Sequence, residues 1–220
     1  MRVFTHFLPT DPENFKAGIR YGTILQFGES WELIGSVIMK NPGSSNFKND
    51  TPAKIDELNL YDSGDNACWY EFNPDSTMYC IEQLFKEKYF PKDSGNLSGV
   101  IRIFNLFYSK EPNLNKALEL YSSEGQIIDD LKQIKESINK PIYIGWGSLY
   151  RNPAFKIKAN TIFEIVKEHN PYLNEDIGKN KFYHPMYLIR YGKKKPCVSD
   201  VRESFCKDWY ISVNAESFKK

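Results

Sequence analysis

The sequence lacks the features that mark several classes of protein. No apolar stretch among its 220 residues reaches the roughly 20 residues of a membrane-spanning helix, and residues 1–15 lack the apolar core and cleavage site of a signal peptide. Basic residues (29) nearly balance acidic residues (28), so the net charge does not point to a polyanionic partner. We therefore expect a cytoplasmic protein with no membrane partner.

Cysteine and histidine are scarce as well. The four cysteines form no Cys-x-x-Cys unit, and the chain has only three histidines. Free thiols in a reducing compartment are the simplest interpretation, so we expect neither a metal site nor a cofactor. The chain also has no Walker sequence, Gly-x-Gly-x-x-Gly, Gly-x-Ser-x-Gly or His-Glu-x-x-His, which leaves nucleotide-binding loops, classical hydrolases and metalloproteases without support.

The residues that are present indicate one globular domain spanning 1–220. Hydrophobic residues make up 41% of the chain and aromatic residues 15%, enough for a large core. Apolar segments that resemble strands alternate with amphipathic segments that resemble helices. We therefore predict an α/β three-layer sandwich, with helices flanking a central, mainly parallel sheet of about four strands. The four predicted strands are residues 31–39, 99–104, 141–144 and the segment near 182–188.

Each predicted strand ends on a polar or glycine-rich turn. The four turns are Asn41-Pro42-Gly43-Ser44, Asn105-Leu106-Phe107, Gly145-Trp146-Gly147-Ser148 and His184-Pro185. Ligands of parallel α/β sheets bind beyond the carboxyl ends of the strands, where these four turns would meet. The sequence therefore predicts a binding site at that edge of the sheet.

These turns also have a purely structural explanation. Asn41-Pro42 is an ordinary turn dipeptide, Asn105 is a good helix cap, and a lone histidine is commonly structural. The functional alternative gives Asn41 a bound water or substrate, and lets the Asn105 amide read the edge of a nucleobase. In the same way, most of the aromatic side chains near the turns belong in a core, but one or two can stack on a planar ligand; the candidates are Phe47, Trp146 and Tyr187.

Taken together, the stretches "IMKNPGSS", "IRIFNLFYSKEPN", "IYIGWGS" and "YHPMYL" resemble an uncharacterised bacterial and phage family, the domain of unknown function numbered sixteen forty-three. The resemblance covers roughly residues 20–195, with the motifs in the same order. The same order of motifs is similar to the uracil-DNA glycosylase superfamily. That superfamily has an Asn-Pro or Asp-Pro turn after the first core strand, an asparagine after a second strand, and a late His-Pro motif.

The second resemblance implies a DNA glycosylase, which cleaves the N-glycosidic bond of a damaged or modified base after flipping it from double-stranded DNA. It makes Asn41 the residue that positions water, Asn105 the one that reads the base and His184 the one that stabilises the departing base. Because a neutral Asn41 cannot be a strong general base, either Asp50 supplies that role or no residue does. The other substrate-binding candidates are Pro42, Gly43, Ser44, Phe47, Trp146 and Tyr187, and the candidates for DNA contacts are Lys40, Leu188 and Arg190. Such an enzyme needs no metal or cofactor, and we expect a monomer.

Two other functions fit the same residues. One is a non-catalytic protein of the same fold that binds a nucleobase or nucleic acid. The other is an enzyme that processes a free nucleotide. Surface charge distinguishes them, because a basic groove beside the site would favour DNA. The residues that would form such a groove are Lys40, Lys48, Lys110, Arg151 and the run from Lys193 to Lys195.

Overall fold

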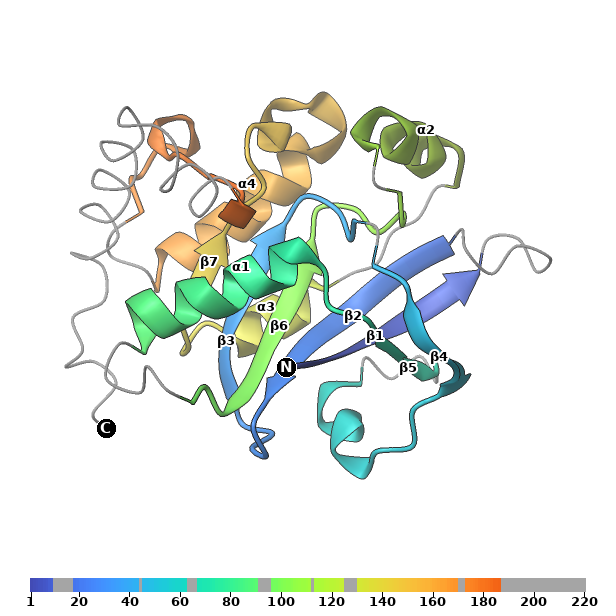
Figure 1. Ribbon diagram of the computed structural model, residues 1–220. Coiled ribbons are helices and arrows are strands. Elements are labelled where there is room, and N and C mark those ends of the chain that lie inside the picture. The colour runs from blue at the N-terminus through green and yellow to red at the C-terminus, as the bar shows by residue number, and fades with distance from the viewer. Residues whose placement is uncertain are drawn as a thin grey trace, which may run out of the picture.

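A single mixed sheet organises the protein. The computed structural model describes residues 1–9, 18–43, 45–62, 67–90, 96–111, 113–124, 130–169 and 173–186 (Figure 1). The described residues form one sheet of seven strands in the order β4-β5-β1-β2-β6-β3-β7. The strands are β1 (Arg2–Pro9), β2 (Gly18–Phe27), β3 (Leu33–Met39), β4 (Phe47–Pro52), β5 (Trp69–Phe72), β6 (Gly99–Asn105) and β7 (Ile142–Ile144).

The prediction of a mainly parallel sheet of about four strands is wrong. β3 is parallel to both β6 and β7, but the other four pairings, β1/β2, β1/β5, β2/β6 and β4/β5, are antiparallel. The error came from counting only strands that alternate with helices. β1 is buried over residues 3–7, so it lacks the alternation that marks a half-exposed strand, and β5 is only four residues long.

The fourth predicted strand is also absent from the described part of the chain. Residues 181–184 form no strand, and residues 187 and 188 lie outside the described residues. Hydrogen bonds from other elements hold this segment instead. The Gly147 N–H donates to the Phe182 carbonyl at 2.6 Å, and the Tyr143 hydroxyl donates to the carbonyl of Tyr183. The segment thus lies against the end of β7 without extending the sheet.

Helices cover both faces of the parallel part of the sheet. α1 (Ser76–Leu84), which continues into the π-helical turn η2 (Phe85–Tyr89), lies across one face (Figure 1). α3 (Leu131–Glu136) and α4 (Pro153–Lys167) cover the other face, and α2 (Leu114–Glu124) precedes them. The short 3₁₀ helices are η1 (Asp56–Tyr61), η4 (Leu149–Arg151) and η5 (Ile177–Lys179). No helix in the described ranges has the length and apolar character to cross a membrane.

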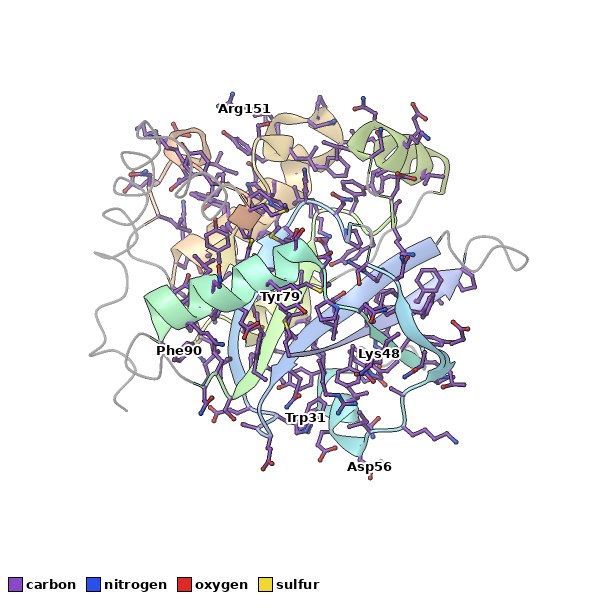
Figure 2. All side chains as sticks on the ribbon, in the orientation of Figure 1. Trp31, Lys48, Asp56, Tyr79, Phe90 and Arg151 are labelled. Carbon is purple, nitrogen blue, oxygen red and sulfur yellow. The ribbon has the colours of Figure 1, made fainter. Side chains whose placement is uncertain are left out.

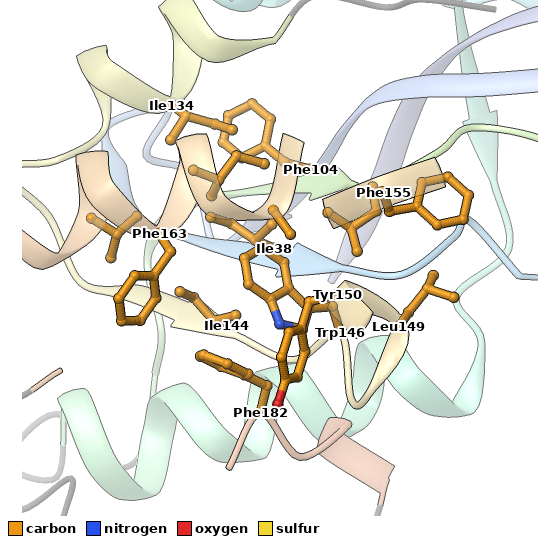
Figure 3. Packing of buried hydrophobic residues seen from close by; sticks show 14 of the residues in the cluster. Ile38, Phe104, Ile134, Ile144, Trp146, Leu149, Tyr150, Phe155, Phe163 and Phe182 are labelled. Carbon is orange, nitrogen blue, oxygen red and sulfur yellow. The ribbon is translucent and has the colours of Figure 1, made fainter. Parts of the chain in front are cut away.

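Alternating side chains of the parallel strands build two cores. On β3, Val37 and Met39 pack toward α1, whereas Ile38 packs toward α4. The α4-side core contains Trp146, which is 1% exposed and packs edge-on against Phe182 with 5.2 Å between ring centroids (Figure 3). The glycine-rich turn after β7 therefore directs its tryptophan into the core, and Trp146 is not a ligand-stacking residue.

Replacing Trp146 with alanine should lower the free energy of unfolding by about 3–5 kcal/mol, because the substitution leaves a large cavity in a close-packed core. The matched control is Ile157→Ala on α4, where the isoleucine is 81% exposed. That substitution should change the free energy of unfolding by no more than about 0.5 kcal/mol. Chemical denaturation of both variants measures the difference. Equal losses would contradict the assignment of Trp146 to the core.

Candidate functional site

A pocket of about 240 Å³ opens where β3 and β6 end, beside the N-terminus of α1. Asn41, Asn105 and His184 all line it, although 143 residues separate the first from the last in sequence. The rest of the lining comes from β2, the ends of β3 and β6, the loop after β3, α1 with its N-cap, and the segment near His184. Those residues are Arg20, Thr23, Met39, Lys40, Pro42, Gly43, Asp75, Ser76, Thr77, Met78, Ile81, Ile103 and Met186.

The loop after β3 is held in place by a buried guanidinium. Arg20 on β2 is 2% exposed; its Nη2 donates to the carbonyl of Pro42, and its Nη1 donates to that of Ser45 at 3.3 Å. Burial lowers the pKa of Arg20 to about 10, while the carboxylate of Asp75 acts to raise it, so the side chain stays charged at neutral pH. Asn41 adds a further hydrogen bond, because its Nδ2 donates to the Glu111 carbonyl at 3.0 Å.

Asn105 is positioned through its backbone. Its N–H donates to the Tyr108 hydroxyl at 3.3 Å, and its carbonyl accepts from Lys158 Nζ at 3.0 Å. Both partners meet the buried carboxylate of Asp130: Tyr108 donates to Oδ2, and Nζ of Lys158 lies 3.3 Å from Oδ1. Burial raises the pKa of Asp130, and Lys158 and Arg102 oppose that shift. This network fixes the Asn105 backbone. The Asn105 side chain is buried at the pocket wall, and its Oδ1 has no hydrogen-bond partner among the described residues.

His184 faces the pocket as a neutral imidazole. Burial and the nearby positive charge of Lys40 lower its pKa to about 4. Nδ1 lies 3.4 Å from the backbone N–H of Met186 and accepts from it, so the ring proton resides on Nε2. Gly145 lets this segment approach, because a Cβ at that position would lie only 3.1 Å from Pro185. At neutral pH, His184 is therefore an uncharged hydrogen-bond donor and not a protonated imidazolium.

The pocket also holds a carboxylate that the sequence did not single out. Asp75 caps α1, with its side chain accepting from the Met78 N–H at 3.0 Å. Its Oδ2 lies 3.6 Å from the place where a Cβ on Gly43 would stand, and no other described atom beyond the residues that adjoin Gly43 lies within 4 Å of that place. Gly43 has φ +77, a left-handed conformation that suits glycine. The turn after β3 thus leaves open space beside the Asp75 carboxylate.

The structure separates the remaining predicted site residues into two groups. Lys40, Pro42 and Gly43 line the pocket. Asp50 and Phe47 do not, because both lie on the outer edge strand β4, the strand that carries Lys48 (Figure 2). The Asp50 side chain is exposed there, which is a poor setting for a general base of this pocket. Ser44, Tyr187, Leu188 and Arg190 lie outside the described residues.

Phe47 belongs to an aromatic cluster at the edge of the sheet. Its ring centroid lies 4.4 Å from that of Phe72 and 4.9 Å from that of Phe7. The sequence suggested Phe47 as a stacking platform because it closely follows the Asn-Pro turn. The intervening residues instead lead the chain away from the pocket and into β4.

Arg20 and Asp75 are the two site residues that sequence reasoning missed. Arg20 comes from an antiparallel neighbour of β6, outside the set of strand ends considered. Asp75 has a recognisable signal, since an Asn-Pro-Asp-Ser stretch before an apolar helix is typical of a helix N-cap. Nothing in that signal identifies a pocket, and the position of Asp75 depends on how α1 crosses the sheet.

The described residues contain no cluster of histidine, cysteine or acidic side chains that would hold a metal ion. Comparison with known proteins adds no relative: no protein-family model, curated protein sequence or solved structure matches this chain.

The neutral state of His184 makes stability depend on pH. An unfolded histidine binds a proton near pH 6.5, whereas folded His184 resists protonation until about pH 4. The contribution of this shift to the free energy of unfolding is therefore fully present above about pH 6.5. It decreases by about 3 kcal/mol as the pH drops to 4. Denaturant unfolding at pH 7 and pH 4 measures the loss. His184→Gln, which does not titrate, should lose less over the same interval, and an equal loss would contradict the shifted pKa.

Proposed function

We propose that this chain is an N-glycosidase that removes a damaged or modified base from DNA after flipping the base into the pocket. The observation behind the proposal is the set of side chains that meet there. A base-reading amide (Asn105), a neutral donor (His184), a water-positioning amide (Asn41) and a carboxylate (Asp75) all line one pocket. These are the groups that N-glycosidic bond cleavage uses, and the reaction requires no metal.

The size of the pocket supports a base as the occupant. At about 240 Å³, it is smaller than the roughly 300–1,000 Å³ of pockets that enclose a drug-sized ligand. A nucleobase fits this space, while its sugar and phosphates remain at the opening. A nucleotide flipped out of the duplex can place its base in the pocket while its sugar and phosphates stay at the opening.

The chemistry follows from the charges that develop as the bond breaks. The bonding electrons leave with the base, so negative charge grows on the base and positive charge on the sugar. His184 Nε2–H donates to the base, which favours the transition state because the base carries little charge before cleavage. Water attacks C1′. Asn41 orients the water through Oδ1, since its Nδ2 is committed to the Glu111 carbonyl, and Asp75 takes the proton.

A second candidate is the same hydrolysis of a free nucleoside. It is favoured by how few of the predicted groove residues reach the pocket; the run from Lys193 to Lys195 lies outside the described residues. Among the predicted groove residues with described positions, Lys40 alone lines the pocket, and Lys48 pairs with Glu71 at 2.9 Å. A DNA complex loses affinity steeply with salt, because lysines displace counterions from phosphates, whereas a nucleoside complex does not.

Base release from a broad panel of duplexes carrying modified bases tests the proposal, with abasic sites as the readout. Unchanged DNA across the whole panel would refute glycosylase activity. The same panel offered as free nucleosides, with the released base measured, separates the second candidate from the first.

Asp75→Asn should slow single-turnover base release on the order of 100-fold or more, because it removes the group that takes the proton from water. Asparagine is also a good N-cap, so α1 and the melting temperature should change little. The matched control is Asp50→Asn on the exposed edge strand, which should leave the rate unchanged. A normal rate for Asp75→Asn, or a slow one for Asp50→Asn, would overturn the assignment.

His184→Ala should slow the same step by roughly 100- to 1,000-fold while leaving DNA affinity nearly intact, because the lost donor acts on charge that develops only in the transition state. Melting temperature, DNA affinity and single-turnover rate are measured on one preparation. A variant that folds, binds and still cleaves at the wild-type rate would remove His184 from the mechanism.

A further inference from the structure

Lys40 differs from the other buried cations around the pocket. Arg20 is anchored on two backbone carbonyls, and Lys158 is anchored on Asp130 and on the carbonyl of Asn105. Lys40 is half-buried in the pocket wall, and no carboxylate of the described residues lies within 4.0 Å of its ammonium group. Among the described residues Lys40 thus lines the pocket without an ion-pair partner.

The surroundings of Lys40 make its proton easier to lose. Burial lowers the pKa of its ammonium group, and no carboxylate of the described residues lies at ion-pair distance to oppose that shift. Its backbone is fixed, because its carbonyl accepts from the Phe107 N–H at 3.3 Å and the preceding Met39 ends β3. A desolvated lysine on a rigid strand end is the kind of amine that forms imines with carbonyl compounds.

The second feature is the place of Lys40 among the proposed catalytic groups. It directly precedes Asn41, and it shares the pocket with Asp75 and His184. If the base occupies the pocket and C1′ of the sugar stands at the opening, removal of the base leaves that carbon beside an amine and a carboxylate. The free deoxyribose at such a site opens to an aldehyde at C1′, which is an electrophile for an amine.

We propose that Lys40 forms an imine with C1′ of an abasic deoxyribose and gives the protein a second activity, cleavage of the DNA strand at the abasic site. The inference rests on the proposed function in one respect: it takes DNA as the polymer that reaches the pocket. It does not require the protein to have released the base itself.

The reaction balances without a cofactor. The lone pair of Lys40 Nζ adds to the C1′ aldehyde, and loss of water gives a protonated imine. The imine makes the C2′ protons acidic, and the Asp75 carboxylate takes one of them. The C–H electrons form the C2′–C3′ double bond, and the 3′ phosphate leaves with the electron pair of its bond to C3′. Water then hydrolyses the imine, which releases the unsaturated aldehyde and restores the amine.

Borohydride trapping tests the proposal. A labelled duplex with one preformed abasic site is mixed with the full-length protein and sodium borohydride, whose hydride reduces the imine to a stable secondary amine. We expect a covalent protein–DNA adduct with its cross-link at Lys40, and strand cleavage when borohydride is omitted. Lys40→Arg keeps the positive charge but lacks the nucleophile, so the adduct and the cleavage should both be lost.

Lys48→Arg is the matched control, because Lys48 lies on the exposed edge strand β4 paired with Glu71, and it should leave adduct formation unchanged. Affinity for the abasic duplex and melting temperature are measured for each variant, and Lys40→Gln provides a second substitution should Lys40→Arg fold poorly. An absent wild-type adduct, or an adduct that persists at another lysine in both Lys40 variants, would overturn the proposal.

The glycosidase proposal and the imine proposal can be refuted independently of each other. Base release from the modified-base panel without an adduct on abasic DNA would support the glycosidase proposal and refute the proposal that Lys40 forms an imine. An adduct at Lys40 without base release from any duplex would refute the glycosidase proposal. It would support a protein that acts on abasic sites made by another enzyme.

Discussion

The candidate site depends on the burial of one guanidinium, that of Arg20. Taking a charged group out of water costs several kcal/mol, so its donors must find acceptors within the protein. Arg20 finds them in the carbonyls of Pro42 and Ser45, and the Asp75 carboxylate supplies the nearby negative charge. Those acceptors lie in the loop that carries Asn41. The loop is thereby held to β2, a strand far from it in sequence, and its shape follows from satisfying the cation.

A second buried cation does the same for the other amide of the pocket. Lys158 on α4 reaches the carbonyl of Asn105 at the end of β6, and its charge is balanced by Asp130. Tyr108 closes the network by linking Asp130 to the Asn105 N–H. In both cases a cation binds backbone carbonyl groups at or beside an asparagine of the pocket. Both asparagines therefore reach the pocket from fixed backbone positions, and Asn41 is held further by its own Nδ2, which donates to the Glu111 carbonyl.

The sequence predicted part of this site and missed the rest for definable reasons. Asn41, Asn105 and His184 lie together because β3 and β6 are parallel neighbours and because Gly147 and Tyr143 hold the last segment beside them. Sequence pattern reveals strand ends but not which strands are neighbours. It therefore predicted the wrong sheet, missed Arg20 on an antiparallel strand, and singled out Asp50, which lies on the edge strand β4, instead of the helix-capping Asp75, which lines the pocket.

The electrostatics of the pocket restrict the roles that its groups can take. Burial and the nearby charge of Lys40, which a protonated His184 would face, together lower the pKa of His184. At neutral pH, His184 can therefore donate a hydrogen bond to a ligand, but it does not carry the extra proton of an imidazolium. Of the cations that line the pocket, Arg20 is held by the carbonyls of Pro42 and Ser45, whereas Lys40 has no ion-pair partner among the described residues.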